Sequence, residues 1–157
     1  MSCVLRITGS DFDVDKFMIE AKFAASDNIT VSKKGEFINA LKKRKNIHNG
    51  IGVIVSNAPF LNFEKQQADA IAYLNKYKSA FIKLKNYDID GWRGLDFGVD
   101  TFPENRFYRE YILSIELIKL CAECGLEIYM SNYFSRKEKR RKKRVGRLFK
   151  KKKSFSR

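Results

Sequence analysis

The chain has few of the residues on which secreted, membrane and metal-binding proteins rely. Its 157 residues include three Cys and one His, and an odd number of cysteines does not suggest a disulfide framework. No apolar run approaches the roughly 20 residues of a membrane span. The N-terminus shows neither a basic start followed by a long apolar stretch nor a small-residue cleavage site. We expect a cytoplasmic protein, or a nuclear one in a eukaryotic host, where the basic run 139–144 would suit import.

Catalytic motifs are also missing. The sequence contains no Gly-x-Ser-x-Gly and no phosphate-binding Gly-Lys-Ser/Thr loop. Its one histidine, His48, follows the cations Lys42 to Lys45, which would disfavour the protonated ring. We therefore nominate no catalytic residue, no metal ligand and no cofactor, and an enzyme using dispersed carboxylates ranks third among the functions considered.

A Cys-x-x-Cys pair, Cys121 and Cys124, is the sharpest motif. It is expected at the end of a helix, where the negative end of the helix dipole disfavours a thiolate and so opposes redox use. A zinc site would need further ligands, and only Cys3 and His48 remain. The pattern predicts buried cysteines that serve packing.

Residues 93–99 faintly resemble the aromatic strand with which RNA-recognition domains stack bases. Such a strand carries several aromatic side chains, and here only Phe97 falls at a useful position. We predict that Phe97 is a core residue.

Apolar periodicity predicts elements in the order β-α-β-β-α-β-α-β. Strands are expected at about 3–9, 29–32, 51–56, 92–99 and 126–130, and helices from 13 to about 26–28, 62–85 and 101–124. The first six elements match a ferredoxin-like split βαβ core, to which a helix and a strand are added. The predicted fold is α+β, in one domain over residues 1–135.

Local signals support the first two helices. Asp13 is expected to cap the first, with Phe12 and Phe17 as a hydrophobic staple across its start. Asn62 is expected to cap a long surface helix that continues to about Lys85.

Two further segments have predictions of their own. A capping box at 101–104 is expected to open a third, largely buried helix, which Gly125 ends. Residues 36–49 are ambiguous: Phe37, Ile38 and Leu41 fit a short helix, whereas Lys42 to Lys45 and Asn46 to Gly50 fit an exposed loop.

The charge is concentrated at the C-terminus. The chain has a formal net charge of +14, and its last 22 residues hold fourteen Lys and Arg against one acid, whereas residues 1–135 hold 18 against 17. A block of like charge repels itself, so we expect residues 136–157 to be a disordered tail. The candidate residues for an anionic partner are Arg136, Lys137, Lys139, Arg140, Arg141, Lys142, Lys143, Arg144, Arg147, Lys150, Lys151, Lys152 and Lys153.

Two anionic partners suit this tail, besides a purely solubilising role. Nucleic acid would be held through phosphate contacts, without base specificity and with steep salt dependence. An anionic membrane surface is the rival, although Val145, Leu148, Phe149 and Phe155 are the only apolar side chains for insertion.

Four stretches carry a resemblance to a known family: residues 7–15, 34–36, 54–56 and 95–98. Together they resemble a family of small uncharacterised bacterial α+β proteins over about residues 3–132, with the tail outside the pattern. Some members are suspected to be immunity proteins of bacterial toxin systems. The resemblance implies binding of another protein and supplies no catalytic residues.

The sequence therefore predicts a non-enzymatic binding domain. Its first expected partner is a protein, in an immunity-type role, with the basic tail as an attachment to an anionic partner. The alternative is a nucleic-acid-associated protein that binds non-specifically through the tail.

Overall fold

The computed structural model describes residues 2–38, 44–100 and 110–132. The elements, in chain order, are β1 (Cys3–Gly9), α1 (Val14–Ala21), β2 (Ile29–Ser32), β3 (Asn49–Ser56), α2 (Phe63–Lys76), α3 (Lys78–Ile82), the 3-10 helix η1 (Lys83–Asn86), β4 (Arg93–Val99), α4 (Ile115–Glu123) and β5 (Glu127–Asn132). The predicted tail, residues 136–157, and the predicted capping box at 101–104 lie outside the described residues. No helix within the described ranges is long and apolar enough to span a bilayer.

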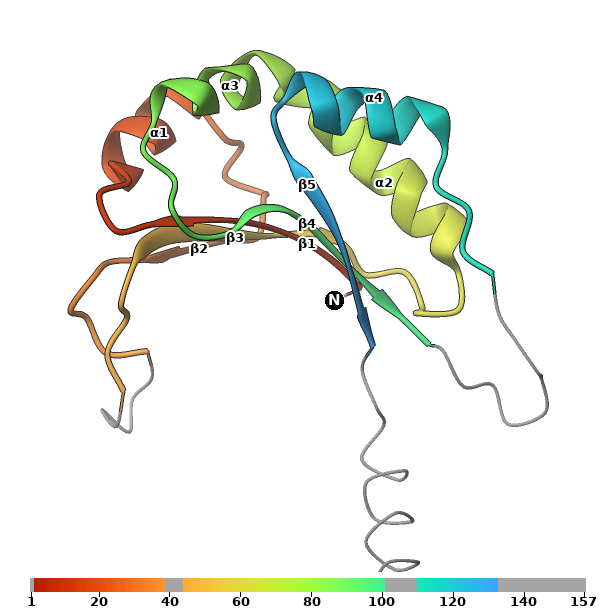
Figure 1. The fold of residues 1–157 in the computed structure, drawn as a ribbon, viewed down its shortest axis with the longest axis horizontal. Coiled ribbons are helices and arrows are strands. Elements are labelled where there is room, and N and C mark those ends of the chain that lie inside the picture. The colour runs from red at the N-terminus through yellow and green to blue at the C-terminus, as the bar shows by residue number, and fades with distance from the viewer. Residues whose placement is uncertain (1, 39–43, 101–109, 133–157) are drawn as a thin grey trace, which may run out of the picture.

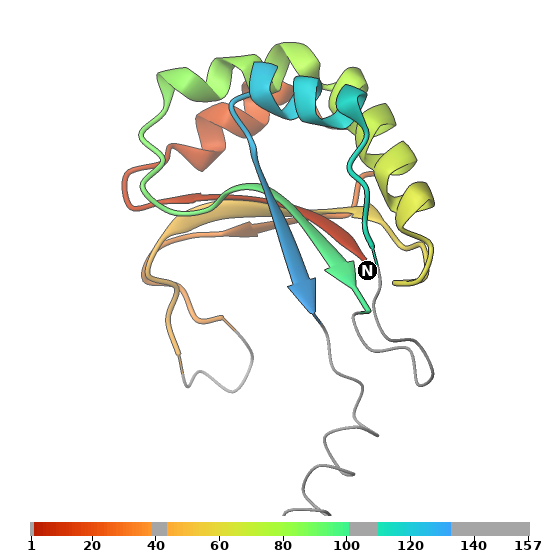
Figure 2. The ribbon, with the colours of Figure 1, turned by 45° about the vertical axis from the view of Figure 1, so that its right-hand side comes forward.

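The strands form one mixed sheet in the order β2-β3-β1-β4-β5. β1 pairs antiparallel with β3 and β4, β2 pairs antiparallel with β3, and β5 is parallel to β4. The four α-helices lie in one layer on one side of this sheet (Figures 1 and 2). We call the opposite side, on which no described helix lies, the open face. This architecture confirms the predicted α+β class.

The first helix begins as predicted and ends early. The side chain of Asp13 accepts from the backbone N–H of Lys16, and the staple rings of Phe12 and Phe17 are both buried, with centroids 5.7 Å apart. Lys22 then adopts a left-handed φ of 49° and ends the helix several residues before the predicted position. Beyond it, the Asp27 carboxylate accepts from the backbone N–H of Ala24 and stabilises a turn.

The predicted long helix from Asn62 to about Lys85 is helical over that range but is divided into α2, α3 and η1. Asn62 caps α2 through the backbone N–H of Lys65, but the helix breaks at Tyr77, where φ is −116°. The Tyr77 hydroxyl accepts from the backbone N–H of Ala24 and donates to the Asp27 carboxylate, so it fixes the chain at this bend. The shorter α3 and η1 then follow the curve of the layer and keep Phe81 and Leu84 buried.

The third helix is shorter and more exposed than predicted. α4 begins only at Ile115, where the Ser114 side chain caps it by accepting from the N–H of Leu117. Before it, Gln67 of α2 donates to the carbonyl of Ile112 at 3.0 Å and accepts from the N–H of Ser114 at 2.8 Å. This Gln67 clamp occupies groups that a longer helix would use. Gly125 ends α4 with φ 62°, as predicted.

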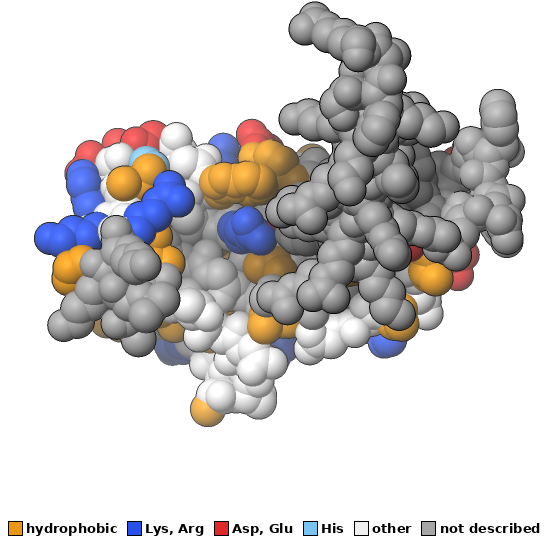
Figure 3. Space-filling view, turned by 90° about the horizontal axis from the view of Figure 1, so that it is seen from below, with side chains coloured by type: hydrophobic (Ala, Val, Ile, Leu, Met, Phe, Trp, Pro, Cys, Tyr) orange, Lys and Arg blue, Asp and Glu red, His pale blue; other side chains and the backbone are white. Residues whose placement is uncertain are grey.

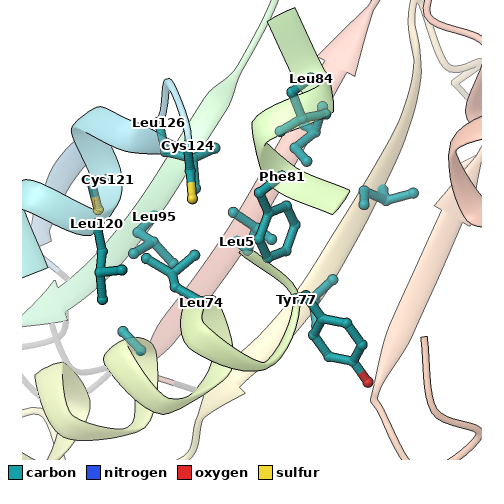
Figure 4. Close-up of a cluster of buried hydrophobic side chains, with 14 of the residues drawn as sticks. Leu5, Leu74, Tyr77, Phe81, Leu84, Leu95, Leu120, Cys121, Cys124 and Leu126 are labelled. Atoms are coloured by element: carbon teal, nitrogen blue, oxygen red, sulfur yellow. The ribbon is translucent and has the colours of Figure 1, made fainter. Parts of the chain in front are cut away.

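The core fills the space between the helix layer and the sheet. Side chains of α2, α3 and α4 meet β1 and β4 there, as Leu5, Leu74, Phe81 and Leu95 illustrate (Figure 4). Phe97 is fully buried among them, which confirms its predicted place in the core. The buried core therefore lies on the helix side of the sheet.

Candidate functional site

The open face is formed by alternate residues of each strand. Because Leu5 of β1 pairs with Val53 and Leu95 in the core, the neighbouring positions point away from the helices. On β1, β3 and β4 these positions are Val4, Arg6, Thr8, Gly50, Gly52, Ile54, Gly94, Asp96 and Gly98. Four of the nine are glycines, so the middle of the open face carries few side chains. A Cβ on Gly52 would meet no heavy atom within 4 Å, whereas side chains of Thr8, Tyr129 and Phe60 lie against Gly50, Gly94 and Gly98.

Three planar side chains stand on this face and form what we call the Trp92 stack: Arg6, Trp92 and Tyr129. The Tyr129 ring lies against Gly94, since a Cβ there would come within 2.9 Å of its Cε2. The Trp92 and Tyr129 ring centroids are 4.2 Å apart, and the Arg6 guanidinium carbon is 5.5 Å from the Trp92 ring centroid. Trp92 is 39% exposed. The stack thus offers aromatic and guanidinium surfaces to a ligand.

A buried carboxylate holds the guanidinium of the stack in place. Arg6 Nη2 lies 3.2 Å from Asp96 Oδ2, and the Asp96 side chain is 2% exposed whereas that of Arg6 is 38% exposed. At the other end of the stack, the Tyr129 hydroxyl donates to Glu127, which raises the pKa of Tyr129. Tyr129 is therefore neutral, and Arg6 carries the positive charge of the stack.

One polar cluster lies where β1 ends and β3 and β4 begin. Ser10 Oγ is 3.2 Å and Asp90 Oδ1 is 3.9 Å from the same ring nitrogen of His48, Nδ1. The backbone N–H of Ser10 donates to Asp90 and lowers the pKa of that carboxyl. A hydrolytic triad needs the hydroxyl and the carboxylate on opposite ring nitrogens, so this cluster lacks the geometry of a proton relay. Its hydrogen bonds join the loops at this end of the open face.

A basic hairpin extends from β2 and β3. It lies in the segment whose secondary structure the sequence did not decide. The backbone N–H of Gly35 donates to Asn46 O, and that of Ile38 donates to Arg44 O, so the described part is an antiparallel ladder. The short-helix alternative is therefore wrong for Phe37, which pairs with Lys45. Residues 39–43 lie outside the described residues.

The basic hairpin comprises the described residues 33–38 and 44–45, which carry Lys33, Lys34, Arg44 and Lys45 against Glu36. Lys34, Arg44 and Lys45 are exposed, and Lys45 Nζ lies 5.3 Å from the centroid of the Phe37 ring. The hairpin projects from the sheet on the side away from the helices (Figure 1). On the open face, Lys and Arg side chains gather at this end, and a further one lies beside hydrophobic side chains nearer the middle (Figure 3).

The three cysteines are buried, which confirms the packing prediction. Burial raises the pKa of Cys121 to about 12 and raises those of Cys3 and Cys124. The thiols are thus protonated at neutral pH, in the state least suited to nucleophilic attack. Within the described ranges, no group of three or more His, Cys, Asp or Glu side chains is placed to hold a metal ion.

A groove of about 560 Å³ lies at the start of α2. Leu61, Phe63, Tyr111 and Ile112 line it together with two carboxylates of glutamate residues. Beside it, Ile112, Ile115 and Ile118 are 72%, 71% and 47% exposed, and we call these three the isoleucine ridge. Such a ridge is the kind of apolar surface that a protein partner would cover.

The sequence and the structure nominate different residues. The thirteen predicted tail residues, Arg136 to Lys153, lie outside the described residues, so their anionic partner stays a prediction. Sequence reasoning missed the Trp92 stack and the basic hairpin. The hairpin had a signal in its four consecutive bases, Lys42 to Lys45. The Trp92 stack had no signal in the sequence, because Arg6, Trp92 and Tyr129 are far apart in the chain.

Comparisons with protein-family models, with curated proteins and with solved structures gave no match. The resemblance to small bacterial α+β proteins therefore stays a prediction.

Proposed function

We propose that this chain is a non-enzymatic protein that binds nucleic acid on the open face of its sheet. The observation that carries the proposal is the Trp92 stack, which stands on a glycine-lined face beside the basic hairpin. Phosphate groups bind Lys and Arg side chains, and bases stack on aromatic and guanidinium planes. The two features together match both parts of a nucleotide.

The proposal includes the finer description of the fold. The order β2-β3-β1-β4, antiparallel throughout, supports a ferredoxin-like split βαβ core, to which α4 and β5 add a parallel strand. That arrangement puts the helices on one side and leaves the other side for a ligand.

The test uses the full chain and a fluorescently labelled oligonucleotide in an anisotropy titration. Replacing Lys33, Lys34, Arg44 and Lys45 by Gln should weaken binding by roughly one to two orders of magnitude at moderate salt. The slope of log K against log salt should become shallower by about two to three, because each phosphate contact on a single strand contributes about 0.7. We expect the basic residues of the tail to account for the salt dependence that remains in this variant.

A matched control removes the same charge from the helix layer. Lys22, Lys83, Lys85 and Lys119 are exposed there, and their replacement by Gln should leave the affinity within about twofold, since their charges lie on the far side from the bound strand. If both quadruple variants weaken binding equally, only net charge matters and the open face is not the site. If the full chain binds no oligonucleotide at low salt, the proposed function fails.

A protein partner is the second candidate, because the isoleucine ridge is exposed beside an apolar groove. In the immunity-type role, the chain would protect cells from a toxin encoded beside its own gene. Changing Ile115 and Ile118 to Ser should abolish that protection, whereas the hairpin variant should keep it. Absence of a neighbouring toxin gene would argue against this role.

A further inference from the structure

Trp92 is held rigidly, although its ring is exposed. Its backbone N–H donates to Thr8 Oγ1 at 2.8 Å, and its carbonyl accepts from the N–H of Thr8 at 2.7 Å. The preceding Gly91 lies so close to Thr8 that a Cβ would come within 2.4 Å of the hydroxyl oxygen. The indole therefore projects from a fixed piece of backbone, and its exposure does not arise from a loose loop.

The stack runs across the sheet, with Trp92, which directly precedes β4, between Arg6 of β1 and Tyr129 of β5. Gly94 lets the Tyr129 ring lie on the strand, Trp92 packs on Tyr129, and Arg6 lies over Trp92. Because Asp96 pairs with Arg6, the guanidinium plane is kept beside the indole instead of turning to solvent. A planar ligand that joined this stack would gain contact without rearranging the fold.

The surroundings limit the kind of planar ligand. The basic hairpin continues β2 and β3, and β3 is separated from β4 by one strand, roughly 10 Å in all. On β3, Gly52 leaves open space over the strand, and β1, which lies between β3 and β4, carries Thr8 and Arg6 on this face. A nucleic-acid strand whose phosphates bind at the hairpin can therefore also reach the stack with a base. A free planar molecule would have no use for the basic hairpin.

We infer that the Trp92 stack binds an unpaired base, so that the nucleic acid on the open face is single-stranded. The inference rests on the proposed nucleic-acid function. In a duplex the faces of the bases are covered by their neighbours, and only phosphates and base edges are offered. A single strand exposes base faces, which stack on aromatic rings and on Arg planes with little preference for sequence.

The chain carries its own probe for this contact, because Trp92 is its only tryptophan. We would titrate the full chain with oligothymidylate, with a strand of equal length whose bases are replaced by abasic sites, and with a duplex of similar length. Oligothymidylate should quench the indole fluorescence. The abasic strand and the duplex should bind through their phosphates without comparable quenching.

Two variants keep the test independent of folding. Trp92→Ala should weaken binding of oligothymidylate about tenfold and leave binding of the abasic strand within about twofold. Arg6→Lys keeps the charge opposite Asp96 but removes the guanidinium plane, and should weaken only oligothymidylate by several-fold. Equal affinities of wild type and both variants for oligothymidylate would overturn the inference, as would equal quenching by the duplex. The proposed function would survive either result, and it fails separately if none of the three nucleic acids binds.

Discussion

The Gln67 clamp gives the most direct test of how this fold overrides its local sequence. The apolar pattern before Ile115 favours helix, yet Gln67 occupies the carbonyl of Ile112 and the N–H of Ser114. Gln67→Met removes both hydrogen bonds and keeps the length of the side chain. We expect two consequences: a loss of stability and an extension of α4 toward its N-terminus.

The size of the effect follows from the two bonds. Gln67 is 7% exposed, and each bond of this kind contributes about 1 kcal/mol net, so the variant should lose about 2 kcal/mol. For a chain of this size that loss lowers the Tm by roughly 4–8 °C. Urea unfolding followed by circular dichroism measures the free energy, and the ellipticity of the native baseline measures the helix content, which should rise.

Two controls separate the clamp from ordinary helix effects. Asn75→Met makes a similar change at an exposed position of α2 and should alter stability by less than about 0.5 kcal/mol. Ser114→Ala removes the cap, costs about 1 kcal/mol and should not lengthen the helix, because the clamp is still present. A Gln67→Met variant with unchanged stability and unchanged helix content would refute the reasoning.

Two further predictions concern the sheet and the thiols. Gly94→Ala should displace Tyr129 and strain the pairing with Glu127, whose carbonyl would lie 2.3 Å from the new Cβ, at a cost of roughly 1–3 kcal/mol measured by urea unfolding, with a shift in Trp92 emission. The buried thiols should resist alkylation at pH 8 until the chain unfolds. Since burial raises the pKa of Cys121 from 9.0 to about 12, the folded state holds its proton longer, so the contribution of this thiol to stability should be constant below about pH 8 and fall as pH rises through 9 to 12. A rise in stability over that range would contradict the burial of these groups.

Local signals predicted where several elements begin and end. Asp13, Asn62 and Gly125 act as the caps that their chemistry indicates, because a cap depends only on residues within one helical turn. The strand predicted at about 3–9 is likewise present as β1. These parts of the fold are encoded in short stretches of chain.

The misplaced elements depend on distant partners. α2 breaks at Tyr77 because its hydroxyl bonds to Asp27, and α4 starts late because of Gln67. The same limit applies to the candidate site. Arg6, Trp92 and Tyr129 become neighbours only through the strand order, which periodicity does not reveal.

The uneven placement of charge in the domain affects how it would approach a polyanion. Residues 1–135 are nearly balanced in total, yet outside the described residues of the basic hairpin they hold sixteen acids against fourteen Lys and Arg. The domain therefore has a local concentration of positive charge at its hairpin end. A negatively charged strand would attract that end and turn the domain before contact, which raises the association rate at low ionic strength.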